Sequence, residues 1–556
     1  MKLTLTILSA VTSLISSLNG FAQQSVAKPW PSKMPVVKAP VFKKDTFNIV
    51  NYGAVNDGKT LNTKSINDAI NACSKKGGGV VLIPRGLWVT GPVELKSNVN
   101  LHLKADALLS FTEDLSQYRL IPTNWEGLGS VRNQSPVSGS DLTNIAITGK
   151  GIIDGNGDAW RMVKKDKLTE SQWKNVLASG GFLSDDKKIW YPSESSLKGS
   201  KVKNAGVIAD GKTAEDFAEI KDFLRPNLIV LTRCKNILLD GVTFQNSPAW
   251  NIHPLMSENI TIRNIYAKNP WYAQNGDGLD LESCSNVLVE NSVFDVGDDG
   301  ICIKSGRDAQ GRKRAMPTQN VVIRNCVVYH AHGGFVIGSE MSGGAKNIYV
   351  SDCTFIGTDI GLRFKTTRGR GGVVENIFIK NINMKDIAGE ALLFDMYYAA
   401  VDPIPVAGEK RDAPKVQLLP VTEETPAFRN FYISNVVAHG AEKAIFVRGL
   451  PEMNINNIFL ENMTLQAKKG IEIEEAQHIH MKNIHVITRD SKPVVSIVNS
   501  GNLSFDKLQY KEGAAVLFNV NGERSSKISV TNTNVIGSVN KAEFNNDAKS
   551  DALKIN

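Results

Sequence analysis

From residue 98 onward the chain repeats one short sequence motif, called the phrase below: an asparagine followed by aliphatic or β-branched residues at alternate positions. Alternation with a period of two is typical of β-strands that bury one face. From Asn236 to Asn483 these anchoring asparagines lie 23, 27, 34, 27, 29, 54, 27 and 26 residues apart, and units of this length leave no room for a crossover helix. The phrase begins at Asn98, Asn144, Asn236, Asn259, Asn286, Asn320, Asn347, Asn376, Asn430, Asn457 and Asn483.

A repeat of this length predicts an all-β solenoid, a single right-handed parallel β-helix whose coils stack about 4.8 Å apart around a continuous core. We expect the asparagines to stack at one corner, where their amides can bond the backbone of the neighbouring turn. The 54-residue interval is interpreted as two turns with one asparagine lost. Tandem β-sandwiches or a propeller are the alternatives, but the chain shows few of the tight hairpin turns that those folds use.

A capping helix is expected before the repeat, and three insertions interrupt the repeat itself. The apolar positions within residues 62–76 follow helical spacing and three glycines at 77–79 end the pattern, which predicts a helix that covers the end of the core. A large loop insertion at about 156–226 is expected on one face, where it can form a binding wall. Shorter excursions are expected at 307–317 and 400–425.

The first residues have the composition of an export signal. A basic start, an apolar run over residues 3–18 and a boundary of small residues at 20–22 predict a signal peptide over residues 1–22. Residues 23–45 form a lead-in rich in proline and lysine, and residues 46–556 form the β-helix domain. We therefore expect an exported protein, periplasmic or extracellular, with no membrane insertion after signal cleavage.

The composition of the chain excludes few classes of binding partner. The formal net charge of +8 allows an anionic polymer as partner, but the lysines and arginines form no run like a nucleic-acid patch, so no nucleic acid is expected. The six cysteines lack the density of a disulfide scaffold and contain no zinc-type pair, so they are interpreted as small buried residues.

Three carboxylates occupy two turn-like segments, at Asp277 and at Asp298 with Asp299. Either segment alone is explained by turn chemistry, because glycine and Asx residues favour tight turns. Their positions in the repeat are a second observation, which turn chemistry does not explain. Asp298 and His332 each lie 12 residues after the asparagine that begins their repeat, so the two residues should sit one above the other on neighbouring coils.

Other chemical side chains fall at similar distances from their anchors. His253, Asp277, Arg363 and Lys365 lie 17, 18, 16 and 18 residues after theirs, which predicts that five consecutive coils send them to one surface strip. One carboxylic acid there could protonate a glycosidic oxygen while another carboxylate deprotonates water. Arg363 and Lys365 could hold a substrate carboxylate. The alternative is a ladder of stacked polar turns with ion pairs and no catalysis.

Four ordered motifs on successive coils resemble glycoside hydrolase family 28, the polygalacturonases and rhamnogalacturonan hydrolases. The resemblance covers most of the chain, from the segment at residue 48 to the coils near residue 483. One departure is Ala331, where the family usually has glycine before the histidine. The matching motifs are Asn275-x-Asp277, Asp298-Asp299, His332-Gly333 and Arg363-Phe364-Lys365.

The resemblance implies inverting hydrolysis of α-1,4-galacturonosyl linkages in pectin, with no cofactor and no metal. It makes Asp298 the general acid, Asp277 with Asp299 the residues that activate water, and His332 the group that tunes the acid. The remaining candidates are assigned to substrate binding: Asn275, Arg363, Lys365, Tyr398 and His253.

The insertions resemble those of bacterial exo-acting members, in which extra loops close one end of the groove. We therefore expect release of monomer or short oligomers from a chain end. Three alternatives stay open: a rhamnogalacturonan-directed member of the family, a calcium-dependent pectate lyase, and a non-catalytic polysaccharide-binding β-helix.

Overall fold

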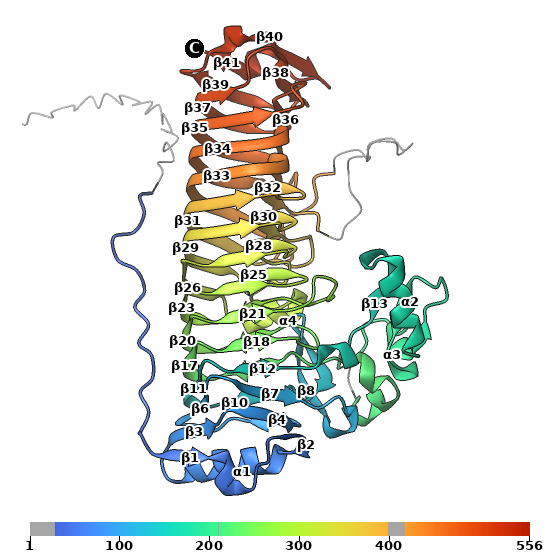
Figure 1. Cartoon of the computed structure of the whole chain (residues 1–556). Coiled ribbons are helices and arrows are strands. Elements are labelled where there is room, and N and C mark those ends of the chain that lie inside the picture. The colour runs from blue at the N-terminus through green and yellow to red at the C-terminus, as the bar shows by residue number, and fades with distance from the viewer. Residues whose placement is uncertain (1–27, 209–210, 399–416) are drawn as a thin grey trace, which may run out of the picture.

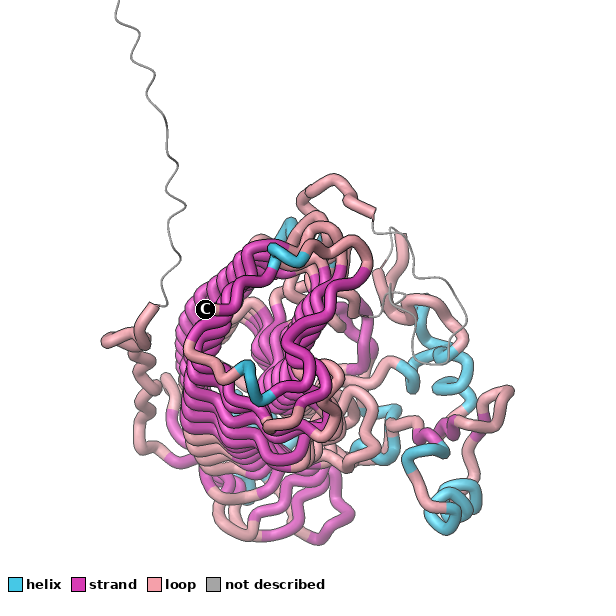
Figure 2. The backbone as a smooth tube through the Cα atoms, turned by 90° about the horizontal axis from the view of Figure 1, so that it is seen from above, coloured by secondary structure: helices cyan, strands magenta, loops and turns pink. Residues whose placement is uncertain are grey.

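The computed structural model describes residues 28–208, 211–398 and 417–556, and the predicted signal peptide lies outside them. The chain forms a tall right-handed parallel β-helix, built from one sheet system of 36 strands in parallel pairs (Figure 1). Seen along its axis, the coils superpose as a closed ring (Figure 2). The predicted fold class is therefore confirmed.

Three faces of each coil carry strands. The first coils contain β1 (Thr46–Asn48), β2 (Asp57–Leu61), β3 (Gly79–Ile83), β4 (Gly86–Thr90), β5 (Val93–Glu94), β6 (Val99–Leu103) and β7 (Ala107–Phe111). The face that carries the candidate site, called the site sheet below, continues through β10 (Val137–Ser140), β16 (Ile229–Thr232), β19 (Ile252–Leu255), β22 (Leu279–Glu282), β25 (Asp299–Lys304), β28 (Gly333–Ile337), β30 (Ile360–Lys365) and β32 (Glu390–Asp395).

The other two faces follow the same coils. One contains β11 (Thr143–Gly149), β17 (Lys235–Asp240), β20 (Glu258–Arg263), β23 (Ser285–Glu290), β26 (Thr318–Arg324), β29 (Ala345–Ile356) and β31 (Val373–Lys385), and the next contains β12 (Ile152–Asp154), β18 (Thr243–Gln245), β21 (Tyr266–Lys268), β24 (Val293–Asp295) and β27 (Val327–Tyr329). The last coils contain β33 (Ala427–Arg448), β34 (Ile455–Glu474), β35 (Ala476–Thr488), β36 (Val495–Val498), β37 (Gly501–Tyr510), β38 (Ala514–Asn521), β39 (Ser526–Thr531), β40 (Ser538–Asn545) and β41 (Leu553–Ile555).

The core is a column of like side chains, because parallel strands in register place equivalent residues directly above one another. Ile301 pairs with Phe335, which pairs with Leu362 on the next coil, and all three are buried. Phe364, on the same strand as Leu362, and Phe394 on the following coil also lie in contact, with ring centroids 4.6 Å apart. The alternation seen in the sequence therefore corresponds to inward and outward positions of each strand.

The anchoring asparagines form a ladder at one corner. Asn259, Asn286 and Asn320 all have left-handed backbone conformations, with φ near +55°, which asparagine tolerates better than most residues. The Asn286 amide donates to the Asn259 side-chain oxygen at 3.3 Å, and the Asn320 amide donates to Asn286 at 3.2 Å. The expected stacking is confirmed, but the amides bond the next asparagine side chain rather than the neighbouring backbone, since the side chains point along the axis.

The 54-residue interval is one coil with a long excursion, so its interpretation as two turns was wrong. Strand β31 pairs directly with β33, with Ile377 opposite Phe431, which places Asn376 and Asn430 on adjacent coils. The extra length follows β32 and includes residues 399–416, which lie outside the described residues.

The N-terminal cap is confirmed as α1 (Thr63–Lys75). Its apolar side chains, Ile66, Ala69, Ile70 and Cys73, are fully buried against the first coils. All six cysteines are free and buried, as expected from the sequence. None of the helices in the described residues is both long and apolar enough to span a membrane.

The insertion at 156–226 projects to one side of the column (Figures 1 and 2). It contains β13 (Val163–Lys164), α2 (Glu170–Ala178), β14 (Phe182–Leu183), β15 (Ile189–Tyr191), α3 (Glu194–Ser200) and the 3₁₀ segment η5 (Glu215–Phe223). The excursion at 307–317 contains α4 (Asp308–Arg314). An antiparallel hairpin that the sequence analysis did not anticipate, β8 (Leu120–Trp125) with β9 (Leu128–Asn133), packs its Val131 against Phe217 and Leu224.

Candidate active site

The surface strip predicted from the repeat contains the three aspartates and His332. These residues lie at the edge of the site sheet where its strands begin. Asp298 precedes β25 directly, Asp299 is its first residue, and Asp277 lies just before β22. Because Asp299 pairs with Gly333 in register, His332 lands beside Asp298 on the next coil. The side chains of the three aspartates approach one another, with a carboxylate oxygen of each within 4.8 Å of the others.

Glycines allow this close approach. A Cβ on Gly278 would lie 2.5 Å from the Gly300 carbonyl oxygen, and a Cβ on Gly300 would lie 2.4 Å from the Val328 side chain. The Asp-Gly pairs that resembled simple turns therefore allow two coils to pack closely where the carboxylates emerge.

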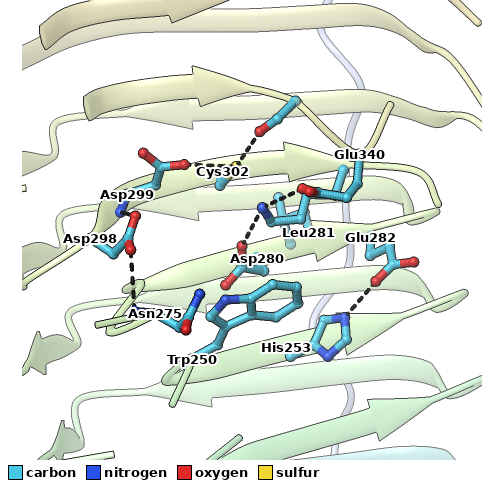
Figure 3. Close-up of polar contacts among 12 residues, drawn as sticks. Trp250, His253, Asn275, Asp280, Leu281, Glu282, Asp298, Asp299, Cys302 and Glu340 are labelled. Carbon is cyan, nitrogen blue, oxygen red and sulfur yellow. Dashed lines mark hydrogen bonds and ion pairs between the residues drawn. The ribbon is translucent and has the colours of Figure 1, made fainter. Parts of the chain in front are cut away.

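Asp298 is held by three donors and remains reachable. Its Oδ2 accepts the backbone N–H of Asn275 at 3.2 Å, and its Oδ1 accepts that of Asp299 at 3.0 Å (Figure 3). His332 Nδ1 lies 3.2 Å from Oδ1, and this hydrogen bond raises the pKa of His332 above its usual value against the opposing effect of burial. The Asp298 side chain is 22% exposed and His332 is 38% exposed, so the pair can meet a ligand.

Asp299 is buried between two cations. Its Oδ2 accepts Lys365 Nζ at 2.8 Å, and its Oδ1 accepts Arg363 Nη1 at 3.2 Å. Burial alone would raise the pKa of Asp299, but Lys365 and Arg363 outweigh it and hold the pKa well below the usual range. Lys365 and Arg363 therefore favour the ionised form of Asp299.

Asp277 has the opposite environment. Its side chain is 3% exposed, and its Oδ1 has no hydrogen-bond partner among the described residues. Burial first, and then the charges of Asp280 and Asp298, raise the pKa of Asp277 well above its usual value. Two neighbouring carboxyl groups thus differ in charge, which is the arrangement expected of acid/base pairs.

A buried charged group that the sequence did not predict lies next to the aspartates. Asp280 in β22 is fully buried, its Oδ1 lies 3.6 Å from Lys304 Nζ, and Lys304 also pairs with Glu340 at 3.0 Å. Burial, together with the negative charges of Asp299 and Asp298, raises the pKa of Asp280 to about 8 despite Lys304. The available signal was the alternation of Asp280 and Glu282 with leucines in β22, a pattern that an ordinary solvent-exposed strand face also has.

The proposed substrate-binding residues separate into two groups. Arg363, Lys365 and Tyr398 lie together, with Lys365 Nζ 4.9 Å from the centre of the Tyr398 ring. Asn275 borders Asp298, and its side-chain oxygen accepts Arg225 at 3.0 Å.

His253 does not reach the surface of the strip. Its ring is fully buried, and Nδ1 lies 3.2 Å from the Asn227 side chain. Nε2 lies 3.0 Å from Glu282 (Figure 3). Its expected role at the substrate is therefore corrected to one inside the sheet, because both ring nitrogens already have partners.

The aspartate cluster also has the ligand type that a divalent cation prefers. Both oxygens of Asp299, however, already accept hydrogen bonds from cationic side chains. Arg363 and Lys365 place two positive charges directly beside the cluster and would repel a divalent cation, so the donor set suits proton chemistry better than a metal site.

A parallel β-helix with clustered carboxylates, a histidine and an Arg/Lys pair on one sheet defines a polysaccharide-processing class of protein. A family model described as glycosyl hydrolases family 28 matches residues 183–438, and one described as rhamnogalacturonase A/epimerase, pectate lyase-like, matches residues 46–121. The chain is 32% identical to a probable polygalacturonase of Vitis vinifera, with 69% of this chain and 72% of the relative aligned.

A bacterial relative and a solved structure agree with this assignment. The chain is 30% identical to an exo-poly-alpha-D-galacturonosidase of Dickeya chrysanthemi, over 76% of this chain and 68% of the relative. The crystal structure of a hyperthermoactive exopolygalacturonase from Thermotoga maritima matches with a TM-score of 0.64 and 31% identity, over 81% of this chain and 93% of that one. The chain belongs to glycosyl hydrolase family 28.

Proposed function

We propose that this protein is an exo-acting polygalacturonase that hydrolyses α-1,4-galacturonosyl linkages of pectic polysaccharide. The observation that carries the proposal is the cluster of Asp277, Asp298 and Asp299 beside the Arg363–Lys365 pair. It supplies carboxyl groups of different protonation state and cations for an acidic sugar in one place. The exopolygalacturonase relatives support the same substrate class.

In this mechanism Asp298 protonates the glycosidic oxygen of the leaving sugar. Its side chain is partly exposed, and His332 at 3.2 Å can carry the proton that the acid delivers. Water is activated on the other side of the bond by Asp299, which stays ionised, with Asp277 as the second partner of that water. General acid–base help of this kind contributes about 10²- to 10⁴-fold in rate.

Arg363, Lys365 and Tyr398 are proposed to bind the galacturonate carboxylate and ring. In the free protein the two cations face Asp299, so a substrate carboxylate would share them with that residue. Arg363 Nε has no partner among the described residues, which leaves a donor for an incoming carboxylate. Asn275 orients Asp298 through its backbone N–H.

Exo action is supported by a wall across the site sheet. The tip of the β8–β9 hairpin contacts the α4 excursion, where Arg307 N–H donates to the Gly127 carbonyl at 3.2 Å and Gly129 N–H donates to Gln310 at 2.8 Å. On its other edge the hairpin pairs with the insertion, where Val131 N–H donates to Gly206 at 2.7 Å. Loop closure was expected from the insertion and α4, and the hairpin that joins them is the added element.

Inversion at the anomeric carbon is part of the proposal. Inverting glycosidases usually separate their two carboxyl groups by about 6.5–9.5 Å and retaining ones by about 5–5.5 Å. The nearest oxygens here lie within 4.8 Å, which by itself favours retention. Asp299, however, is buried with both oxygens bonded to cationic side chains, so it is placed to hold a water molecule rather than to reach the anomeric carbon itself.

Size analysis of early digests tests the exo assignment. Polygalacturonate incubated with the enzyme should release monomer or one short oligomer from the first time points. An early ladder of mixed oligomers would show endo action. ¹H NMR of the first product then gives its anomer: inversion of the α-linkage predicts the β-anomer, and the α-anomer would show retention.

A rhamnogalacturonan-directed activity is the second candidate, because the rhamnogalacturonase-type model matches residues 46–121. That segment covers the cap and first coils and does not include the strip. Defined rhamnogalacturonan and galacturonate oligomers, digested side by side, distinguish the two substrates. A calcium-dependent lyase would instead give an unsaturated, ultraviolet-absorbing product that is lost on chelation.

The protein is also proposed to be exported. The signal-type segment at 1–22 supports cleavage before Gln23 and delivery to the periplasm or the exterior, where pectin fragments are met. Peptide sequencing of the mature N-terminus tests it, and a chain that retains Met1 would contradict it.

A further inference from the structure

A cavity of about 550 Å³ lies beneath the β8–β9 hairpin, on the first coils of the site sheet. Its floor is formed by outward side chains of β5, β10, β16 and β19, and its roof by the hairpin. The volume is in the range typical of small-ligand sites. None of the three aspartates of the strip lines it.

A stack of side chains separates this cavity from the strip. Trp125 of the hairpin lines the cavity and stacks on Trp250, with ring centroids 5.4 Å apart and the planes at 17°. Beyond Trp250 lies Lys304, whose Nζ is 4.8 Å from the ring centre and which pairs with Asp280. The cavity is therefore a compartment of its own behind the wall that closes the strip.

The lining is cationic. Lys96, Arg119, Arg132 and Arg233 line it against one carboxylate, Glu94. Glu94 pairs with Arg119 at 3.1 Å, and Arg233 is neutralised by Asp141 outside the cavity at 2.7 Å.

Arg132 has no direct ion pair within the described residues, and the charge of Glu126 acts on it only at longer range. Its side chain is 6% exposed, it lies 3.8 Å over the Trp125 ring, and it forms no ion pair and donates no hydrogen bond within the described residues. Burial lowers the pKa of Arg132 to about 9, and the charge of Glu126 opposes this shift without reversing it. A buried guanidinium without a direct ion pair is stabilised when an anion binds to it.

Two neighbouring groups are also unpaired. Asn124 and Asn133 line the same cavity, and their side-chain oxygens are buried without a hydrogen-bond donor among the described residues. Buried polar atoms are normally satisfied, so a ligand here should bring both an anion for Arg132 and hydroxyl donors for the amides. A uronic acid carries this combination.

We propose that the cavity is a second binding site for a galacturonate unit, with Arg132 taking the carboxylate and Asn124 a ring hydroxyl. The choice of galacturonate among uronic acids rests on the proposed function, whereas the anion and hydroxyl chemistry rests on the cavity alone. Such a site would retain released sugar or the end of a neighbouring polymer chain beside the closed strip.

Equilibrium dialysis of the full-length mature enzyme with radiolabelled galacturonate tests the proposal. Wild type should bind two equivalents, one at the strip and one in the cavity, and Arg132→Met should bind the second at least 10-fold more weakly. Arg429→Met, an exposed arginine on the outer face paired with Glu375, is the matched control and should keep both equivalents. If Arg132→Met does not fold, Ser138→Phe fills the cavity from its floor and should remove the same equivalent.

Polygalacturonate hydrolysis is measured on the same wild-type preparation. An active enzyme that binds one equivalent, or an Arg132 and Ser138 variant pair that keeps two, overturns the second site and leaves the function standing. An inactive enzyme that binds no galacturonate overturns both. Two competitors define the chemistry: galactose that fills the second site contradicts the carboxylate contact, and acetate that displaces galacturonate from it equally well contradicts the sugar assignment.

Discussion

His332 lies directly above Asp298 on the next coil, and two contacts join them. The His332 backbone N–H donates to the Asp298 carbonyl at 2.9 Å, and Nδ1 lies 3.2 Å from the Asp298 carboxylate. The same coil geometry that stacks the core therefore couples a histidine to the candidate acid, and this coupling makes the pH dependence of the enzyme predictable.

The alkaline limb of the pH profile should depend on His332. Its pKa is raised above 6.5 by the hydrogen bond to Asp298, so the pair keeps its proton to a higher pH than a free imidazole and loses it above that value. We expect kcat/KM of wild type to fall with a midpoint above pH 6.5. In His332→Gln the midpoint should move to lower pH, because the imidazole that holds the proton is gone, and kcat should fall about 10- to 100-fold. An unchanged midpoint would contradict the pairing.

Lys365 should be needed for both folding and activity, for different reasons. Lys365→Met leaves Asp299 buried without its nearest cation, and breaking a buried pair costs about 3–5 kcal/mol of unfolding free energy. The double variant Lys365→Met/Asp299→Asn removes both charges and should recover most of that stability, but no activity. Urea unfolding and hydrolysis rates measure the two effects, and a double variant as unstable as the single one would contradict the account.

Displacing the hairpin tip should convert exo action into mixed action. Gly127 has φ +78°, and a Cβ there would lie 2.6 Å from the backbone nitrogen of Arg307, so Gly127→Val pushes the tip from α4. Early digests should then contain longer oligomers. Gly180→Val is the control, because Gly180 also has positive φ but has nothing within 4 Å of its Cβ position. A Gly127 variant with the wild-type product pattern would show that this contact does not close the groove.

Asp280 should make the protein less stable as pH rises. Its pKa is near 3.8 when unfolded and about 8 when folded, so the folded state holds the extra proton. Its stabilising contribution is complete below pH 3.8 and is lost progressively up to pH 8. Asp280→Asn should therefore melt several degrees above wild type at pH 8, with a smaller gain at pH 5, whereas the exposed Asp185→Asn should show neither change. A lower melting temperature at pH 8 would show that pairing with Lys304 dominates.

The fold was predictable because its rule is local. The period-two alternation and the anchoring asparagines mark every coil, and each coil packs only on its neighbours. The β8–β9 hairpin was not predictable for the opposite reason. Its partners Phe217 and Leu224 lie about 90 residues further along the chain, and its two strands carry no repeat signal.

The site could be predicted where residues lie at equal distances from the anchoring asparagines of neighbouring coils. Equal distances from the anchors place Asp298 beside His332, and the structure has them in contact. Residue spacing does not show which side chains touch or which are covered by their neighbours. For this reason the pairing of Arg363 with Asp299 and the burial of Asp280 could not be predicted from it. His253 shows the limit most clearly: its spacing matches the strip, but its ring is buried against Glu282.

The role of Asp298 as the proton donor is tested most directly by comparing two substrates in Asp298→Asn. On polygalacturonate the leaving sugar needs a proton, and kcat should fall about 10²- to 10⁴-fold with the melting temperature unchanged. On 4-nitrophenyl α-galacturonide, whose leaving group departs without one, kcat should fall less than about 10-fold. Equal losses on the two substrates, or full activity on polygalacturonate, would contradict the assignment.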